Sequence, residues 1–271
     1  MTRIPCSVGI LTFNSAATLP RALESVKMCD DIIICDGGST DDTLAIARSY
    51  GCRIIAQDAE FKNADGTLKN YAGVRNQCVD AAKKPWFLYI DSDESASPEL
   101  MRELASIAAQ DDQTAAYRIP VRFIVMGRRI DYASNYPGYQ YRVLRTDRGT
   151  RFVKPVHEQP PQFAPGATLG TLRGPWFVYW ERADVEGYEA RNFKYLPMEV
   201  ERARGMRCGR FLLHFLPWHL RAVFAVLLKS AWYRLLHPFA AHMPLKVEAG
   251  RVRYQLRLIA DVAKMTWRKT T

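Results

Sequence analysis

The first hundred residues alternate short apolar runs with longer segments in which apolar residues recur every three or four positions. Short continuous apolar runs bounded by charge are typical of strands buried on both faces of a parallel sheet. The expected strands are 8–13, 31–36, 53–56 and 86–90. Each is followed by a segment with helical spacing. This alternation predicts a parallel α/β sheet with right-handed crossovers.

Residues typical of helix N-termini indicate where the helices of this part of the chain begin. Ser39 or Thr40 is the expected N-cap of the second helix, and the aspartates that follow complement the helix dipole. The third helix is expected over 68–82. Ser97 is the expected cap of the fourth helix, because Pro98 suits a first helical turn.

The pattern changes beyond residue 115. Strand-like pieces separated by Gly, Pro and Asn residues are expected at 117–125, 139–144 and 151–153. We expect them to be later, partly antiparallel strands of the same sheet. Residues 159–175 are rich in Pro and Gly and are expected to be loop, and the chain beyond Asp184 is expected to be helical. The predicted domains are an α/β domain over 1–180 and a helical region over 181–271.

Composition supports a globular chain with an uneven charge. The 271 residues are 48% hydrophobic and 24% charged, which excludes the composition of a disordered protein. Residues 1–117 hold 11 Lys and Arg against 17 Asp and Glu, a net charge of −6, whereas residues 118–271 hold 27 against 11, a net charge of +16. This asymmetry indicates an acidic front that uses a metal ion and a basic rear that meets phosphates, although a basic surface can also simply be solvated.

The cysteines and the N-terminus point to the cytoplasm. The six cysteines form no CxxC pair and mostly lie in apolar runs, so a reduced chain without zinc is expected. The apolar run near the N-terminus is too short for a signal peptide and lacks its cleavage site.

The first candidate site follows the second expected strand. Asp36 ends this strand, and Gly37 and Gly38 come directly after it. Ligands of open α/β sheets bind outside the carboxyl ends of the strands. The glycines let the backbone approach a ligand, and a carboxylate at the strand tip can accept hydrogen bonds from a base or a ribose. A plain glycine-rich turn is the alternative.

The second candidate site follows the strand 86–90. Asp91, Asp93 and Glu94 lie within four residues there. Two carboxylates separated by one residue can hold a hard divalent cation, which bridges the phosphate oxygens of a nucleotide. Solvated acids ahead of a helix are the alternative, but the position at the end of a buried strand favours a cation site.

The two motifs, together with Thr12-Phe13-Asn14 at the end of the first expected strand, resemble the family 2 glycosyltransferases of GT-A fold. The resemblance covers roughly residues 4–160. It implies a Rossmann-like, mostly parallel sheet flanked by helices. The domain over 1–180 is then a nucleotide-sugar-binding catalytic domain.

The resemblance also implies roles for single residues. Asp36 matches the acidic residue that meets the nucleotide base, and Thr12 lines the same pocket. Arg75 matches an arginine that helps to hold the nucleotide, although a helix-surface charge is its alternative. Asp91 and Asp93 match the DxD motif. Asp93 is then the direct ligand of Mg²⁺ or Mn²⁺, and Asp91 lies nearer the ribose or the metal's water.

A third cluster lies between residues 140 and 158. Inverting sugar transfer needs a carboxylate that removes the proton of the acceptor hydroxyl, and Glu158 is the candidate base. The Val-His-Glu segment resembles a subgroup related to lipopolysaccharide-core sugar transferases, and departs from the acidic pair of the commoner family pattern. His157 is a metal ligand, a diphosphate contact or a structural histidine. Arg142 and Arg145 serve the phosphates or face solvent.

The C-terminal region is basic and aromatic. Within 210–240 the longest uncharged stretch, 211–220, has ten residues and contains Pro217, whereas a spanning helix needs about 20. Apolar and aromatic residues interleaved with Arg221, Lys229 and Arg234 suit helices that lie in the membrane interface with their cations on anionic headgroups. A helical lid packed on the sheet is the alternative. Nucleic-acid binding is not expected, because no module for it is recognised.

The leading hypothesis is a metal-dependent inverting glycosyltransferase that is peripheral on the cytoplasmic face of the membrane. It moves a sugar from a UDP-sugar to a lipid-linked or lipopolysaccharide glycan. The rivals are a nucleotidylyltransferase and a non-enzymatic basic protein that binds membranes or nucleic acid. The chain lacks the GxxxxGK[ST], GxGxxG, GxSxG and HExxH motifs of other enzyme classes.

Overall fold

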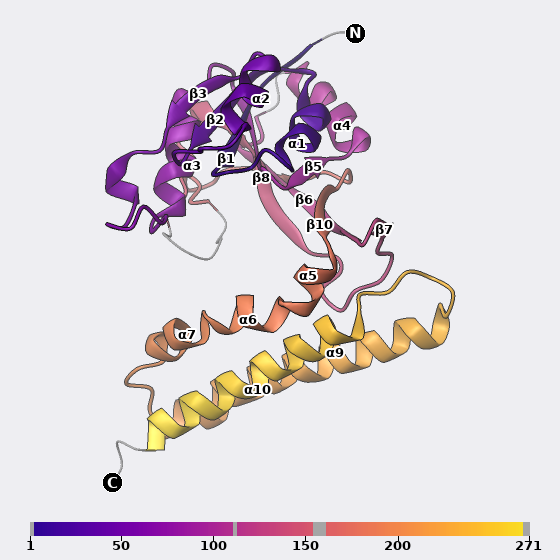
Figure 1. Ribbon diagram of the computed structural model, residues 1–271. Coiled ribbons are helices and arrows are strands. Elements are labelled where there is room, and N and C mark those ends of the chain that lie inside the picture. The colour runs from indigo at the N-terminus through magenta and orange to yellow at the C-terminus, as the bar shows by residue number, and fades with distance from the viewer. Residues whose placement is uncertain (1–2, 111–112, 154–160, 268–271) are drawn as a thin grey trace. The chain divides into compact units, whose positions relative to one another are not determined.

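The structure is a computed structural model that describes residues 3–110, 113–153 and 161–267. It divides into two compact units (Figure 1). The first unit comprises the chain up to Arg122 together with Pro137–Val178, and the second comprises Phe123–Tyr136 together with the chain from Tyr179 onward. Each unit is described by itself.

Four parallel strands form the first half of the sheet. They are β1 (Ile4–Thr12), β2 (Cys29–Asp36), β3 (Arg53–Ala56) and β4 (Trp86–Asp91), in the order β3-β2-β1-β4. Nearly all residues of β1, β2 and β4 are buried, which explains why their sequences are continuous apolar runs rather than alternating ones. All four strands lie where the sequence predicts them, and β3 matches to the residue.

The helices between these strands are α1 (Leu19–Val26), α2 (Thr43–Ser49), α3 (Tyr71–Ala81) and α4 (Pro98–Ala108), with a short 3₁₀ turn, η1, at Ala59–Phe61. Ser97 caps α4 as predicted, since its side chain accepts a hydrogen bond from the amide of Leu100. The prediction of Ser39 or Thr40 as the N-cap of α2 is wrong, because that helix begins at Thr43 and Asp42 is its N-cap.

The second half of the sheet is mixed. Its strands are β5 (Glu94–Ala96), β6 (Ala116–Val125), β7 (Arg128–Arg129), β8 (Tyr139–Arg145), β9 (Leu169–Thr171) and β10 (Trp176–Trp180), with a 3₁₀ turn, η2, at Thr146–Arg148. β8 is antiparallel to β4, and β6 is antiparallel to β8. The predicted α/β, GT-A class of fold with partly antiparallel later strands is confirmed.

Three details of this half differ from the sequence predictions. Residues 151–153 form no strand, since Arg151 makes only an isolated bridge to Gln162. The strand β9 lies inside the segment that the sequence predicts as loop, and β5 and β10 are not predicted at all.

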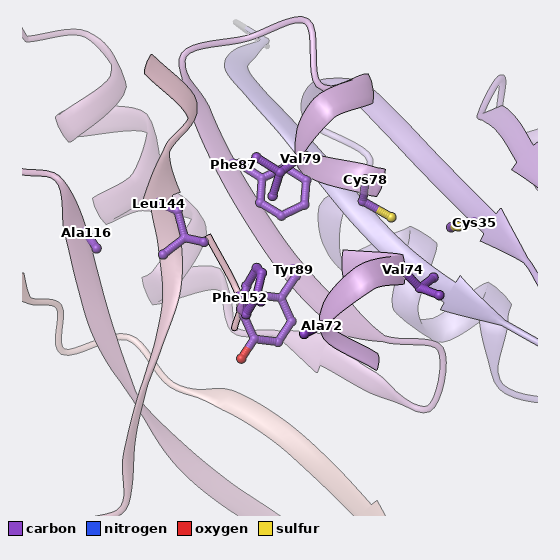
Figure 2. Packing of buried hydrophobic residues seen from close by; sticks show 10 residues of the cluster. All are labelled: Cys35, Ala72, Val74, Cys78, Val79, Phe87, Tyr89, Ala116, Leu144 and Phe152. Carbon is purple, nitrogen blue, oxygen red and sulfur yellow. The ribbon is translucent and has the colours of Figure 1, made fainter. Parts of the chain in front are cut away.

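One core cluster of the first unit lies between α3 and the sheet (Figure 2). Its buried residues are Cys35, Ala72, Val74, Cys78, Val79, Phe87, Tyr89, Ala116, Leu144 and Phe152. Gly9 lets this packing close, because a Cβ there would lie 2.6 Å from Cζ of Phe87 and 2.9 Å from Cβ of Cys78. The core fixes α3, and with it Arg75, against the strands.

The second unit is mainly helical, as predicted for the chain beyond Asp184. Its elements are α5 (Arg182–Glu186), α6 (Tyr188–Phe193), α7 (Leu196–Arg202), α8 (Cys208–Arg210), the π-helical segment η3 (Phe211–Phe215), α9 (Leu216–Leu236) and α10 (Leu245–Trp267). α10 runs alongside α9 (Figure 1). Glu248 of α10 is buried and accepts hydrogen bonds from the amide and the hydroxyl of Ser134, which attaches the segment 123–136 to this unit.

One helical stretch of this unit is longer than its sequence suggests. Residues Cys208–Leu236 run as a continuous helical stretch, which by length and composition alone is sufficient to cross a membrane, and its most apolar window is only 11% buried. Pro217 does not interrupt the stretch, because it lies in the first turn of α9. The expectation that this region offers only a ten-residue apolar segment is therefore wrong.

Candidate active site

The tips of three neighbouring strands meet at one edge of the sheet. β1 lies between β2 and β4, with Thr12 opposite Asp36 and Leu11 opposite Asp91. Because parallel strands share one direction, the loops that follow them emerge side by side. The structure therefore brings Thr12, Asp36 and Asp91 to one place.

Asp36 organises the loop that follows it. One carboxylate oxygen accepts hydrogen bonds from the hydroxyls of Thr12 (2.8 Å) and Ser39 (2.6 Å), and the other accepts from the amides of Gly38 (2.9 Å) and Ser39 (2.8 Å). Burial raises the pKa of Asp36, but these four donors outweigh it and hold the pKa below its ordinary value. The carboxylate is therefore ionised, and its acceptor positions are occupied by Thr12 of β1 and by its own loop.

The loop after β1 is tied to the loop after β2. Asn14 has a positive φ of 48°; its side-chain oxygen accepts from the amide of Thr40 (2.8 Å), and its own amide donates to the hydroxyl of Ser39 (2.8 Å). The hydroxyl of Ser92 donates to that of Ser15 at 2.9 Å, which connects this pair of loops to the DxD segment. All three loops are thus held by side-chain hydrogen bonds, and this explains why Ser39 and Thr40 do not cap α2.

Asp91, Asp93 and Arg75 provide the charges of this edge. The Asp91 side chain is 36% exposed and lies 3.6 Å from the guanidinium of Arg75, and Asp93 is exposed. The side chain of Arg75 is only 8% exposed, and its guanidinium lies over the ring of Tyr89 at 4.8 Å. Arg75 is therefore not a helix-surface charge. It is a buried cation that faces Asp91.

A buried ion pair beneath these loops was not predicted. Glu94 accepts two hydrogen bonds from the guanidinium of Arg142, one from Nε1 of Trp176 (3.0 Å) and one from the amide of Asp91 (2.9 Å). Burial raises the pKa of Glu94 to about 7, although Arg142 acts in the opposite direction. Arg142 therefore does not face solvent; it pairs with Glu94, whose carboxylate accepts from the amide of Asp91.

Arg145, the other arginine of this cluster, is also occupied. It pairs with Asp147 and lies over the ring of Trp86 at 5.3 Å. The sequence contains one signal that Arg142 is buried. Arg142 shares a strand face with Leu144, which is fully buried, and a buried arginine requires an acidic partner.

The donor set suits a divalent cation that arrives together with a nucleotide. Among the described residues, no group of three or more His, Cys, Asp and Glu side chains is placed to hold a metal ion. Asp91 and Asp93 nevertheless offer two accessible carboxylates, and Mg²⁺ is commonly held by one or two carboxylates plus substrate phosphates. These two carboxylates therefore fit a divalent cation that is also bound by substrate phosphates.

The predicted base and the predicted histidine ligand, Glu158 and His157, lie outside the described residues. The chain that leads toward them is fixed on α3. Asn76 donates to the carbonyl of Phe152 at 2.9 Å and accepts from its amide at 3.0 Å. The ring of Phe152 meets that of Tyr89 edge-on at 5.2 Å (Figure 2). Phe152, near the end of the described part of this segment, therefore lies beside Arg75.

Similarity to known proteins agrees with this site. The family model described as glycosyl transferase family 2 matches residues 7–165, which is more than half of the chain. The lipopolysaccharide core biosynthesis glycosyltransferase LpsC of Rhizobium meliloti (strain 1021) is 25% identical over 218 residues, which cover 79% of this chain and 78% of LpsC. An uncharacterized glycosyltransferase of Rickettsia felis is 33% identical over 123 residues, 45% of this chain, and the chain spans only 40% of that relative.

Among solved structures, S. aureus TarS 1–349 in complex with UDP-GlcNAc matches all of this chain and 93% of its own, with a TM-score of 0.48 and 14% identity. The family match, rather than this distant likeness, decides the class. It favours a glycosyltransferase over the nucleotidylyltransferase and the non-enzymatic alternatives. The chain belongs to glycosyl transferase family 2 and is a glycosyltransferase.

Proposed function

We propose that this enzyme transfers a sugar from a UDP-sugar, with inversion and with the help of Mg²⁺ or Mn²⁺, to a lipid-linked or lipopolysaccharide glycan. The observation that carries the proposal is the register of β1, β2 and β4, in which Asp36 and Asp91 end neighbouring parallel strands and Asp93 follows two residues after Asp91. An acceptor for a base and a pair of carboxylates for a diphosphate-bound cation are the groups that a nucleotide sugar requires.

Thr12 and Asp36 line the proposed nucleotide pocket. Because the carboxylate of Asp36 already accepts four hydrogen bonds, it can receive an N–H or O–H from the nucleotide only if one donor turns away. The two hydroxyls, those of Thr12 and Ser39, can rotate, whereas the two amides belong to the loop backbone. We expect the Ser39 hydroxyl to move, since Ser39 lies in the loop and Thr12 is buried in the sheet.

Asp93 is the proposed direct ligand of the cation, and Asp91 lies nearer the ribose or the metal's water. When bound, the cation supplies positive charge that stabilises the leaving diphosphate. Arg75 holds its guanidinium toward Asp91, and so it fixes that carboxylate and adds positive charge at the same edge. Glu94 keeps the backbone at Asp91 in place through the amide hydrogen bond.

Glu158 is the proposed base, which removes the proton of the acceptor hydroxyl as that oxygen attacks the anomeric carbon. Its support is the sequence position of Glu158, six residues after Phe152, which is fixed next to Arg75 and Tyr89. His157 is proposed to assist at the metal or the diphosphate.

The proposed acceptor class rests on the LpsC similarity, which covers four-fifths of both chains, and on the basic C-terminal region. We propose that the nucleotide-sugar-binding catalytic domain is 1–180 and that 181–271 attaches the enzyme to the cytoplasmic face of the membrane. No nucleic acid partner is proposed.

The charged residues of α10 favour an α9 that lies on the membrane surface over an α9 that spans the membrane. α10 packs along α9 and carries charged residues such as Arg253, Arg257 and Asp261. If α9 crossed the bilayer, α10 would have to enter with it, at about 2.5–3.5 kcal/mol for each ionised residue near the bilayer centre. A helix that lies in the interface leaves α10 on the aqueous side.

The test is turnover of UDP-sugars with and without Mg²⁺ or Mn²⁺, repeated for Asp93→Asn. Asp261→Asn, which removes an aspartate paired with Arg257 on α10, is the matched control. We expect chelation and Asp93→Asn each to lower turnover by more than about 100-fold, and the control to keep it. Unchanged turnover after chelation and in Asp93→Asn would remove the metal role.

A further inference from the structure

A groove of about 530 Å³ lies at the start of the long apolar helix of the second unit. It is formed by a single stretch of chain, Met206 to Arg221, so its shape is set locally. The lining residues are Met206, Arg210, Leu213, His214, Phe215, Pro217, Trp218, His219 and Arg221. None of them has a role in the proposed sugar transfer.

Pro217 explains why the helix is irregular at this point. A proline has no N–H to donate to the carbonyl four residues earlier, here that of Leu213, and its ring crowds that carbonyl. The chain responds with the π-helical segment Phe211–Phe215, in which the amide of Leu216 donates to the carbonyl of Phe211, five residues back. Such single π-helical turns occur frequently at functional sites. The widened turn coincides with the groove.

The groove is lined by Arg210 and Arg221 and by no acidic residue. Residues 202–247 contain eight Lys and Arg and no Asp or Glu. Elsewhere in this unit arginines pair with acids, as Arg253 does with Glu189 and Arg257 with Asp261. Within the described chain, no ion pair is found for Arg210 or Arg221, and both are exposed. These two cations are therefore available to an anionic ligand.

The same groove continues into an apolar surface. Leu213 is 73% exposed and Trp218 is 71% exposed. Along α9 the exposed apolar side chains Phe224, Leu228 and Leu235 follow at spacings of four and seven residues, so they share one face of the helix. An apolar stripe that begins between two free arginines matches a molecule with an anionic head and hydrocarbon chains.

We propose that this groove is a binding site for the headgroup phosphate of an anionic membrane lipid. Arg210 and Arg221 hold the phosphate, while Leu213 and Trp218 contact the start of the acyl chains. The inference rests on the membrane association proposed above and adds a saturable site to it. A purely diffuse electrostatic attraction to the membrane predicts instead that every Lys or Arg near the membrane surface contributes equally. Each such charge would then raise the affinity for vesicles about fivefold.

The experiment titrates monomeric dihexanoyl phosphatidylglycerol, below its critical micelle concentration, into the full chain by calorimetry. Dihexanoyl phosphatidylcholine and inorganic phosphate are titrated in parallel. We expect one phosphatidylglycerol per chain, with affinity at least tenfold higher than for either comparison ligand. Phosphate that binds as tightly as the lipid would assign the groove to a free anion, and equal binding of both lipids would remove the charge recognition; either result overturns the proposal.

The variant Arg210→Gln/Arg221→Gln is expected to lower phosphatidylglycerol affinity by more than tenfold. The control Arg204→Gln/Arg257→Gln removes the same charge from arginines that pair with Glu201 and Asp261, and should change affinity by less than threefold. Equal losses in the two variants would show diffuse attraction and refute the site. Trp218→Ser keeps both charges and should also weaken lipid binding; no effect would refute the acyl contact.

Two readouts keep this inference separate from the proposed function and from self-association. Binding of UDP with Mn²⁺ should be the same in the wild type and in all groove variants. If the wild type binds no UDP, the proposed donor site is disproved, whereas the lipid result still stands. Sedimentation velocity without lipid should give a species whose mass does not change in Trp218→Ser. A dimer that this substitution dissociates would mean that a second copy covers the stripe, and would overturn the proposal.

Discussion

Replacement of Arg142 by Met removes the cation that neutralises a buried carboxylate. Glu94 and Arg142 have side chains that are only 7% and 3% exposed, and the guanidinium also lies 4.2 Å from the ring centre of Trp176. Breaking a buried pair from one side costs about 3–5 kcal/mol, because the remaining charge is left uncompensated. That is a large part of the roughly 5–15 kcal/mol by which a domain is stable.

The cost should depend on pH in a defined direction. Glu94 has a folded-state pKa raised to about 7 from an ordinary value of 4.5, so its contribution to stability is fully present below the unfolded value and is lost as the pH rises through 7. Below that pH Glu94 is protonated and uncharged, so the loss of Arg142 leaves no carboxylate charge buried without a partner. We expect Arg142→Met to cost about 3–5 kcal/mol at pH 8.5 and about 1–2 kcal/mol at pH 5.5.

The assay is urea unfolding followed by circular dichroism at the two pH values. Arg145→Met is the matched control on the same strand, because the carboxylate of its partner, Asp147, is 49% exposed; it should cost under about 1 kcal/mol at both. Glu94→Gln/Arg142→Met should recover much of the loss, since no charge stays buried. An equal cost of Arg142→Met at pH 5.5 and pH 8.5 would refute the reasoning.

Three further predictions concern the sheet, the nucleotide loop and the apolar helix. Gly9→Ala should lower the free energy of unfolding by about 1–3 kcal/mol, because its Cβ would overlap the ring of Phe87; a change below about 0.5 kcal/mol in urea unfolding would contradict this. For Asp36, burial raises the pKa but the loop donors lower it overall, so its carboxylate stabilises the fold above its unfolded pKa and this is lost as the pH falls through the folded value. Wild type and Asp36→Asn should therefore differ more in stability at pH 7 than at pH 3, and an unchanged difference would be inconsistent with an ionised acceptor. Leu228→Ser/Trp232→Ser, at side chains 67% and 59% exposed, should reduce cosedimentation with anionic vesicles at least tenfold without lowering the thermal midpoint; full cosedimentation would argue against this face as the membrane contact.

The parallel strands and the chemistry at their tips could be predicted because both have local signals. A strand buried on both faces is read from a continuous apolar run, and Asp36 and Asp91 are the first polar residues after the runs 32–35 and 86–90. Neighbouring parallel strands then bring these polar ends together without any further information.

The strand β5 could not be predicted in this way, because its stability comes from distant residues. Its sequence, Glu94-Ser95-Ala96, has no strand pattern, yet all three residues are buried. Glu94 is satisfied by Arg142 and Trp176, which lie 48 and 82 positions further along the chain. A buried polar strand of this kind is recognisable only once its partners are known.

The start of α2 and the C-terminal helix show two other limits. Ser39 suits a cap by residue type, but its hydroxyl donates to Asp36 instead. Pro217 interrupts the apolar stretch in the sequence, whereas the widened turn before it absorbs the missing hydrogen bond and lets the helix continue. Both outcomes depend on where a side chain or a backbone group finds its partner.

The central claim is that the tips of β1, β2 and β4 form one site for a nucleoside diphosphate and a divalent cation. The most direct measurement is anomalous diffraction from crystals grown with UDP and Mn²⁺. The account predicts a manganese peak in direct contact with an oxygen of Asp93 and with the diphosphate, and a uracil ring beside Thr12 and Asp36. A well-occupied UDP bound elsewhere, or a manganese ion that contacts neither Asp91 nor Asp93, would contradict it.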